Sequence, residues 1–355
     1  MPNLRTFAIR HSLPFARAVL KLPPAMLRAM SGGGATVRDG LTLDPQVQLL
    51  VSLRARLSPP SLGDGDIAAA RAEFRLQSVA FGGAPIEVGS VTDRTVDGPG
   101  GPIRVRRYVP ESPARALPMM IFAHGGGFVL GDLETHDLVC RSLCRDAGVQ
   151  LLAIDYRRAP EHQCPAAIDD AIAVFHWVVT NADALDVDRA RIGFGGDSAG
   201  ANISAVASQL LARAGGAAPG FQLLIYPPCD RVTARASLSL FADGFILTRA
   251  DIDWFDLQYA GGSGIGPEDP RRSPIFADDL SGLPPAVIVT AGFDPIRDEG
   301  EAYAHALQAA GNEVTLRRFD GFVHGFVSMA AVSESAREAL REIGERLRSL
   351  AYATA

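Results

Sequence analysis

The sequence predicts an α/β fold, in which a mostly parallel sheet is covered on both faces by helices. From about residue 86 onward, apolar runs of strand length alternate with stretches of helical periodicity. The strand candidates at 118–123, 221–226 and 286–290 are apolar almost throughout, as strands are when helices bury both faces of a parallel sheet. The chain has 355 residues, of which 47% are hydrophobic, so it can form a large core.

Residues 1–85 precede this alternation and are expected to be mainly helical. Asp44-Pro45 combines an N-cap residue with a proline at the first helical position. A second helix is expected over 64–77, and the glycine run at 31–34 predicts a loop. No cluster of residues typical of catalysis occurs in this segment.

The other elements are assigned in chain order from their hydrophobic period and from the glycines and prolines between them. Strands are expected over 86–96 and 103–109, joined by a hairpin at 97–101, and over 118–123, 150–156, 191–194, 221–226, 286–290 and 313–319. Helices are expected from residue 135 and over 166–180, 201–212 and 333–350.

Residues 230–274 interrupt the alternation, because they contain no strand candidate and are rich in aromatic residues. We expect an insertion above the sheet that packs with the N-terminal helices as a cap. The alternative, that these aromatic side chains form an ordinary core, is compatible with this, since a cap needs a core of its own. The chain then divides into a cap segment at 1–85, a first core part at 86–229, the cap insertion at 230–274 and a second core part at 275–355.

The stretch Gly196-Asp197-Ser198-Ala199-Gly200 lies between a strand candidate and a helix candidate. This context is typical of a nucleophile elbow, a turn so tight that the serine backbone is strained and the residues two positions away have almost no side chain. The following helix N-terminus favours developing negative charge. Ser198 is therefore the candidate nucleophile.

A second motif, His124-Gly125-Gly126-Gly127, directly follows the strand predicted at 118–123. Three consecutive glycines let backbone N–H groups face a pocket without obstruction, and acyl transfer needs such donors where a carbonyl oxygen becomes negative. A phosphate-binding loop is one alternative, but the glycine spacing and the missing Lys-Ser/Thr pair disfavour it. A plain flexible loop is the other, and it gives no reason for the elbow.

A serine nucleophile requires a base, and His324 is the best placed of the seven histidines because it follows the last strand and precedes the closing helix. His162 is the competing candidate. His176 is expected to be packed beside its neighbouring tryptophan, and His11 and His305 fall in helical segments away from the strand ends.

The base in turn requires an orienting carboxylate. Asp294 follows the strand predicted at 286–290 and should emerge at the same sheet edge as Ser198. Asp298 and Glu299 are rivals, but we expect them to begin the next helix and serve its N-terminus.

The charge pattern narrows the classes of partner. The net charge of −6 argues against a nucleic-acid partner and against general attraction to anionic membranes. The sequence contains no run of 18 apolar residues, so no transmembrane helix is expected. The prolines and basic residues near the N-terminus are not typical of a signal peptide. Short amphipathic helices are expected there, with weak interfacial binding as the alternative.

The four cysteines, Cys140, Cys144, Cys164 and Cys229, form no Cys-x-x-Cys pair and predict free, buried thiols in a reducing, cytoplasmic compartment. His136 shares a helix face with Cys140 and Cys144, which suggests a metal site. We favour a core-facing stripe with a solvent-side His136, because no fourth ligand is evident, and we predict no metal.

The motifs together resemble bacterial esterases of the hormone-sensitive-lipase-like family, family IV of the α/β hydrolases, in the subgroup with Asp before the serine. The matching stretches are His124-Gly125-Gly126-Gly127, Asp155-Tyr156-Arg157, Ala159-Pro160-Glu161-His162, Gly196-Asp197-Ser198-Ala199-Gly200, residues 294–300 and His324-Gly325-Phe326. The order Ser, Asp, His along the chain is also that of the α/β-hydrolase fold.

The resemblance implies an eight-stranded sheet and a cofactor-free esterase acting on small esters with short to medium acyl chains. It implies Ser198 as nucleophile, His324 as base and Asp294 as orienter, with an oxyanion hole formed by the backbone N–H groups of Gly126, Gly127 and Ala199. It makes His162 structural, and relatives are often homodimers. Arg158 and Gln163-Cys164 stand where relatives often carry other residues.

Two other functions remain open from the sequence. Plant gibberellin receptors resemble this family but have lost the catalytic histidine, whereas His324 is present here. An amidase or deacetylase would use the same constellation of residues on a different substrate.

Overall fold

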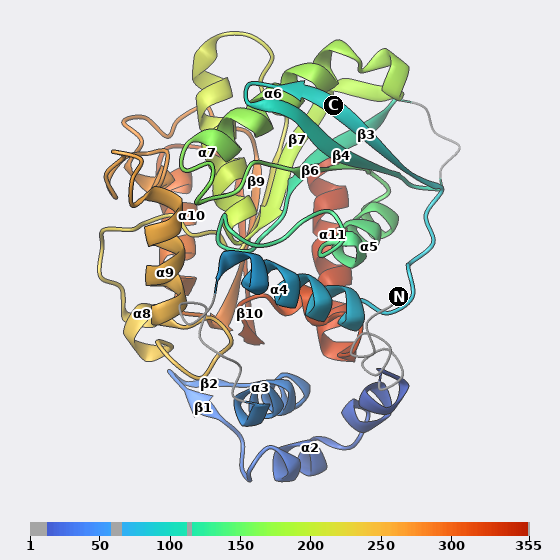
Figure 1. The fold of residues 1–355 in the computed structure, drawn as a ribbon, viewed down its shortest axis with the longest axis vertical. Helices are drawn as coiled ribbons and strands as arrows, with labels where there is room; N and C mark the ends of the chain where they lie inside the picture. The colour runs from blue at the N-terminus through green and yellow to red at the C-terminus, as the bar shows by residue number, and fades with distance from the viewer. Residues whose placement is uncertain (1–12, 58–65, 112–115, 354–355) are drawn as a thin grey trace.

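A computed structural model describes residues 13–57, 66–111 and 116–353 (Figure 1). Its centre is an eight-stranded sheet in the order β10-β9-β8-β7-β5-β6-β4-β3. The strands are β3 (Ser90–Gly98), β4 (Gly101–Val109), β5 (Leu117–Ala123), β6 (Gln150–Asp155), β7 (Val187–Asp197), β8 (Gln222–Ile225), β9 (Ala286–Phe293) and β10 (Val314–Val323). The principal helices are α2 (Pro24–Met30), α3 (Pro45–Leu57), α4 (Ile67–Phe81), α5 (Asp137–Ala147), α6 (Ala166–Thr180), α7 (Ala199–Ala214), α8 (Ala236–Leu240), α9 (Arg249–Ala260), α10 (Arg297–Ala309) and α11 (Glu334–Ala353).

The sheet is mostly parallel, as the sequence predicts. β10, β9, β8, β7, β5 and β6 pair in parallel, whereas β4 runs antiparallel to both β6 and β3. Ala123 pairs with Gly196, and Asp197 pairs with Ile225, so the carboxyl ends of β5, β7 and β8 lie together. The β9–β10 pair ends at Phe293 and Val323. The motif residues that follow these strands therefore meet at one edge of the sheet.

Helices bury both faces of the sheet. One face packs against α5 and α11, through apolar side chains that include Phe122, Leu143 and Ile343. The opposite face packs against α6 and α7 near its middle and against α7 and α10 near β8 and β9. This burial on both faces is the reason that β5, β8 and β9 are buried along their whole length.

The N-terminal segment is mainly helical, with one difference from the prediction. Residues 13–20 are helical, and α3 begins at Pro45 after Asp44, whose side chain accepts the N–H groups of Gln46 and Val47. Between α2 and α3, however, β1 (Val37–Arg38) and β2 (Leu41–Thr42) form a two-stranded antiparallel sheet. The start predicted for the second helix, at residue 64, lies outside the described residues, and α4 begins after the N-cap residue Asp66.

The insertion contains α8 and α9 and no strand, as predicted. Phe241 and Phe245 of the insertion pack with Leu43 and Val47 of the N-terminal segment and with Phe293 at the end of β9. Tyr259 joins a second cluster, to which Phe74 of α4 also packs. The insertion and the N-terminal segment thus share two small cores. No helix within the described part of the chain is long and apolar enough to cross a membrane.

Candidate active site

Ser198 lies in the sharp turn between β7 and α7, with φ 53° and ψ −122°. A left-handed φ is strained for a residue with a side chain, and the crowded neighbours explain how it is maintained. A Cβ on Gly196 would lie 2.4 Å from the carbonyl oxygen of Ala123, and one on Gly200 would lie 1.9 Å from the same atom. Only glycine fits at both positions, so the turn has the geometry that the sequence motif predicts.

A hydrogen-bonded chain links three of the predicted site residues across three loops. The Oγ of Ser198 lies 2.9 Å from Nε2 of His324. Nδ1 of His324 lies 2.8 Å from Oδ2 of Asp294, and this carboxylate is fully buried. Oδ1 of Asp294 accepts the backbone N–H of Ile296 at 3.0 Å, which fixes the carboxylate. With Nδ1–H donating to Asp294, Nε2 carries the lone pair that accepts the serine hydroxyl.

The other histidines lie elsewhere. His162 is exposed in the turn after β6, and His305 is exposed on α10. His176 is exposed on α6, so the expectation that it is packed is wrong, because its side chain points away from the sheet. His11 lies outside the described residues.

The glycine loop after β5 bends back over the turn that holds Ser198. Gly126 and Gly127 have φ values of 113° and 59°, which glycine adopts without strain. Within the described part of the chain, the backbone N–H groups of Gly126, Gly127 and Ala199 donate no hydrogen bond. A Cβ on Gly127 would lie 2.2 Å from the ring of Phe255, so this ring of α9 lies directly against the loop.

The loop is held by Asp197, which is buried beside the serine. Oδ1 of Asp197 accepts the backbone N–H of Gly125 at 2.9 Å and lies 3.2 Å from Nε2 of His136. The hydroxyl of Tyr226 donates to Oδ2 at 3.3 Å. Burial raises the pKa of Asp197, but His136 and the Gly125 N–H more than offset this and leave the pKa below its usual value.

The sequence analysis expected His136 to face solvent. This expectation is wrong, because the side chain is buried at the start of α5. Its Nδ1 lies 2.8 Å from the hydroxyl of Thr135. Cys140 and Cys144 are buried free thiols, and burial raises their pKa values. The described residues contain no group of three potential ligands that could hold a metal ion.

His124 is a structural residue of the loop. Its ring is buried and stacks on Tyr156 with centroids 4.2 Å apart, and its Nδ1 lies 2.8 Å from the carbonyl oxygen of Gly125. The Tyr156 hydroxyl donates to the carbonyl oxygen of His124 at 2.8 Å. Burial, with a smaller effect from His136, lowers the pKa of His124 to about 3, so the ring is neutral near pH 7.

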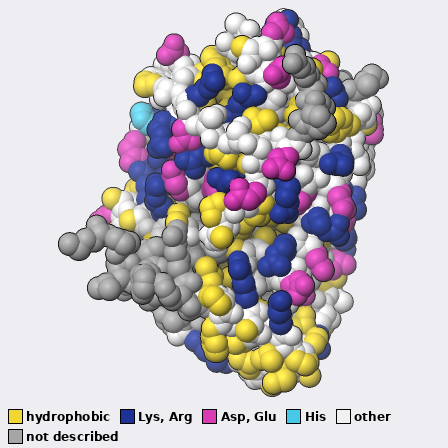
Figure 2. Space-filling model, turned by 90° about the vertical axis from the view of Figure 1, so that its right-hand side faces the viewer, with side chains coloured by type: hydrophobic (Ala, Val, Ile, Leu, Met, Phe, Trp, Pro, Cys, Tyr) yellow, Lys and Arg dark blue, Asp and Glu magenta, His cyan; other side chains and the backbone are white. Residues whose placement is uncertain are grey.

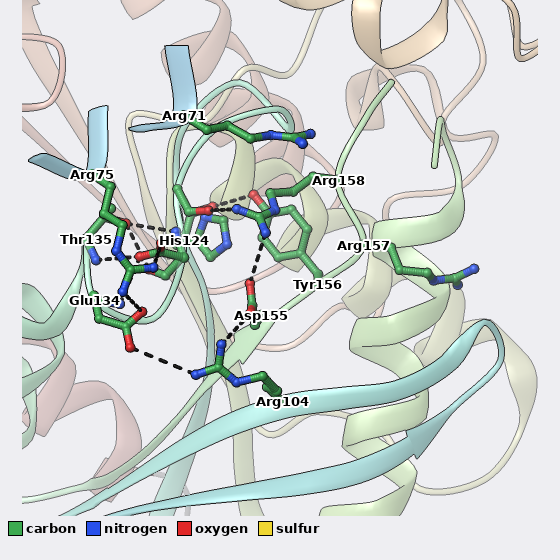
Figure 3. A network of polar contacts seen from close by, with 12 residues as sticks. Arg71, Arg75, Arg104, His124, Glu134, Thr135, Asp155, Tyr156, Arg157 and Arg158 are labelled. Atoms are coloured by element: carbon green, nitrogen blue, oxygen red, sulfur yellow. Dashed lines mark hydrogen bonds and ion pairs between the residues drawn. The ribbon is translucent and has the colours of Figure 1, made fainter. Parts of the chain in front are cut away.

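Charged side chains fasten the segment after the glycine loop to α4 (Figure 3). Arg71 of α4 donates to the carbonyl oxygens of Val129 and Ala159 and pairs with Glu161 at 2.7 Å. Arg75, one turn later, pairs with Asp132 at 2.6 Å. The N-terminal segment is thus bonded directly to the loop that follows β5.

Arg158 and Gln163-Cys164, which stand where relatives often carry other residues, contact the glycine loop and α9. Arg158 donates to the carbonyl oxygen of Gly131 and lies 3.7 Å from Asp155. Gln163 donates to the carbonyl oxygen of Gln258, and the N–H of Cys164 donates to that of Tyr259. These residues therefore join the loop after β6 to the glycine loop and to α9.

Asp298 and Glu299 lie in the first turn of α10, as predicted, and they also hold the insertion. Asp298 accepts the backbone N–H of Ser237 at 2.8 Å, and Glu299 pairs with Arg231 at 2.6 Å. Sequence reasoning missed Tyr226, whose ring centroid lies 4.6 Å from that of His324. Its position at the end of the strand predicted over 221–226 is the one signal that was available.

In sequence the chain is similar to known ester hydrolases. A family model described as the alpha/beta hydrolase fold matches residues 120–328. The chain is 46% identical over 334 residues to the carboxylic ester hydrolase LipN of Mycobacterium tuberculosis, covering 92% of this chain and 88% of the relative. It is 37% identical over 282 residues to an ethyl acetate hydrolase of Pseudomonas putida, covering 78% and 88%.

Solved structures of ester hydrolases are similar to the chain as well. An ester-hydrolase from the metagenome of Lake Arreo superimposes with a TM-score of 0.83 at 40% identity, over 86% of this chain and 98% of that one. An esterase from Pyrobaculum calidifontis superimposes with a TM-score of 0.78 at 39% identity, over 85% and 98%.

Proposed function

The chain belongs to the alpha/beta hydrolase family, in its hormone-sensitive-lipase-like branch, and is a carboxylic ester hydrolase; from this premise we propose that it hydrolyses esters of short to medium acyl chains with Ser198 as nucleophile. The observation that carries the proposal is the hydrogen-bonded chain from Ser198 through His324 to Asp294. Such a chain activates a serine that would otherwise be a weak nucleophile.

The reaction proceeds in two steps. The Oγ of Ser198 attacks the ester carbonyl carbon while Nε2 of His324 takes the hydroxyl proton, and the tetrahedral intermediate collapses to an acyl-enzyme. The same proton passes from His324 to the leaving alcohol. A water molecule then attacks the acyl-enzyme with His324 again as base, which releases the acid and restores the serine hydroxyl. Asp294 stabilises the imidazolium that forms in each step.

The backbone N–H groups of Gly126, Gly127 and Ala199 form the oxyanion hole in this proposal. Two features support it: the left-handed backbone of the two glycines, and the position of Ala199 at the first residue of α7. Donors fixed in advance stabilise the developing oxyanion without reorganisation. His124, Gly125, Gly196, Asp197 and Gly200 support this arrangement without touching substrate.

We further propose that residues 1–85 and 230–274 form the cap over the site. The two small cores that these segments share support this, as does the contact between Phe255 and Gly127. An aromatic wall beside the oxyanion loop favours an apolar acyl or alcohol group. The four buried free thiols support a cytoplasmic location.

Labelling with a fluorophosphonate tests the proposed nucleophile. The wild-type chain should gain one adduct by intact mass, mapped to Ser198, and the Ser198→Ala variant should gain none. In parallel, p-nitrophenyl esters of increasing acyl length should show highest turnover at short to medium chains, and turnover should fall by roughly three to six orders of magnitude in Ser198→Ala. Near-full activity in the variant would contradict the proposal. Equal turnover of an anilide and its matching phenyl ester would indicate an amidase.

A further inference from the structure

The charge of the chain is unevenly distributed. The whole chain has a net charge of −6, yet residues 13–57 contain six arginine or lysine residues and two aspartates, a local net charge of +4. Both aspartates are engaged within the fold: Asp39 pairs with Arg297 at 2.9 Å, and Asp44 caps α3. The positive charge of this segment is therefore not neutralised by its own acidic residues.

Exposed apolar side chains are concentrated in the same segment. Ten large apolar side chains are exposed among the described residues, and five of them lie within residues 13–57. They are Phe15, Met26, Met30, Val37 and Leu53, with Phe15 73% exposed. Single exposed apolar residues need no explanation, whereas exposed apolar residues that lie together mark an interaction surface.

The helices of this segment also bury other apolar side chains against one another. Leu13, Leu20, Leu27 and Leu49 are buried together with Val332, so residues 13–20, α2 and α3 form a small core. Met26 and Met30 are one turn apart on α2, and Arg56 of α3 donates to the carbonyl oxygen of Met30 at 3.0 Å. The exposed apolar residues of the three helices thus lie on one packed unit.

We call the exposed side of this unit the outer face: Phe15, Met26, Met30 and Leu53, with Arg54 and Arg56. Figure 2 shows hydrophobic side chains gathered at the lower end of the molecule, where Figure 1 places α2, with Lys and Arg side chains on the surface just above. Arg54 and Arg56 are exposed, and the side chain of Arg54 makes no hydrogen bond or ion pair with the described residues. An apolar tip beside exposed arginines matches the interface of an anionic bilayer.

The opposite side of the unit lies near the active site. The backbone N–H of Asp44 donates to the carbonyl oxygen of Gly321 at 2.9 Å, three residues before His324. Leu43 and Val47 pack with Val323, the residue next to His324. The segment that presents the outer face therefore also borders the loop that carries the catalytic base.

We propose that the outer face docks the protein reversibly on an anionic phospholipid surface, with the methionines and Phe15 in the headgroup region and the basic groups against lipid phosphates. Adsorption of this kind needs no spanning helix and weakens as salt screens the charges. It positions the cap and the site beneath it at the surface where apolar esters partition. The inference concerns binding and stands whether or not Ser198 is the nucleophile.

Sedimentation with vesicles tests the proposal on the full chain. The Ser198→Ala variant should sediment with vesicles of phosphatidylcholine and phosphatidylglycerol at low salt, as the wild type does, and much less with phosphatidylcholine alone. The double variant Arg54→Glu/Arg56→Glu should bind at least about 25-fold more weakly, about fivefold for each basic charge removed. Met26→Gln/Met30→Gln should bind roughly tenfold more weakly.

Matched controls separate this surface from general effects. Arg94→Glu/Arg189→Glu makes the same change in net charge on exposed sites outside the outer face, and Leu210→Gln/Leu257→Gln removes two exposed leucines of α7 and α9. Both controls should bind like wild type. Equal loss in the controls, or no binding of the wild type to anionic vesicles, overturns the proposal. A wild-type dimer in lipid-free solution that Met26→Gln/Met30→Gln converts to a monomer also overturns it, because the face would then join two copies of the chain.

Discussion

Asp197 accepts the backbone N–H of Gly125 at 2.9 Å, so the residue before Ser198 holds the glycine loop in place. The same carboxylate receives the hydroxyl of Tyr226, whose ring contacts that of His324. One buried side chain therefore sets the position of the proposed oxyanion donors relative to both the proposed nucleophile and its proposed base. Its importance is positional, because it does not reach the reacting atoms.

Removing this acceptor should impair catalysis more than ester binding. We expect Asp197→Ala to lower kcat by about 100-fold with little change in KM, since the loss of one oxyanion donor costs about that much. Asp197→Asn keeps an oxygen for the Gly125 N–H and should lose at most about tenfold. Steady-state rates on a soluble ester check both values, and an equal loss in the two variants would show that the hydrogen bond to Gly125 is not the cause.

The Asp294–His324 hydrogen bond predicts a larger and more specific loss. Asp294→Asn cannot accept the Nδ1 proton in the same way, so it favours the wrong tautomer of His324 and should lower kcat by roughly 10³–10⁴. The rate of fluorophosphonate labelling at Ser198 should fall in parallel. Thermal unfolding supplies the control: a variant that is folded at the assay temperature and still reacts at the wild-type rate would contradict the assigned role.

The tight turn at Ser198 predicts that alanine destabilises the protein much more at Gly200 than at Gly216. A Cβ on Gly200 would lie 1.9 Å from the carbonyl oxygen of Ala123, a backbone atom of the adjacent strand that cannot move away. Gly200→Ala should therefore lower the free energy of unfolding by about 3 kcal/mol or more. Gly216 follows α7 and has open space around it, so Gly216→Ala should change stability by less than about 1 kcal/mol. Urea denaturation of both variants measures the contrast, and similar values would count against it.

Much of the fold could be predicted from the sequence because its signals are local. Buried parallel strands are continuous apolar runs, and β5, β8 and β9 lie within a few residues of their predicted ranges. The pairing of Ser198, His324 and Asp294 followed from one rule, that residues after parallel strands emerge at one sheet edge. The geometry of their contacts agrees with it.

The features that the sequence did not reveal depend on distant partners. His136 is buried because Asp197, 61 positions later, lies beside its ring. The β1–β2 hairpin has two residues in each strand, too few to show a period of two. The attachment of α4 through Arg71 requires carbonyl groups that the fold brings together. In each case the local sequence is compatible with several surroundings, and tertiary packing selects one.

The buried neutral ring of His124 predicts a pH dependence of stability. An unfolded histidine titrates near pH 6.5, whereas the pKa of His124 in the fold is lowered to about 3. Between these values the unfolded chain binds a proton that the folded chain excludes. Above about pH 6.5, His124 therefore does not reduce the free energy of unfolding. Below that pH the free energy of unfolding falls with decreasing pH by up to about 1.4 kcal/mol per pH unit.

Urea denaturation at pH 7, 6 and 5 measures this contribution against His124→Asn, which does not titrate in this range. Between pH 7 and 5 the variant should lose about 2 kcal/mol less than the wild type, although it is less stable at pH 7. Parallel curves for the two proteins would mean that His124 becomes protonated in the folded state.

The contact between Phe255 and Gly127 predicts where acyl-chain length is controlled. Because the ring lies against the proposed oxyanion loop, Phe255→Ala should open space next to the ester carbonyl. Longer acyl chains then gain apolar contact at about 0.8 kcal/mol for each buried CH₂ group, so the ratio of kcat/KM for octanoate to that for acetate should rise by about tenfold. Leu257→Ala, on the same helix but 62% exposed, is the matched control and should leave the ratio unchanged. If both variants raise the ratio equally, the effect comes from loosening α9 and not from the wall that Phe255 forms.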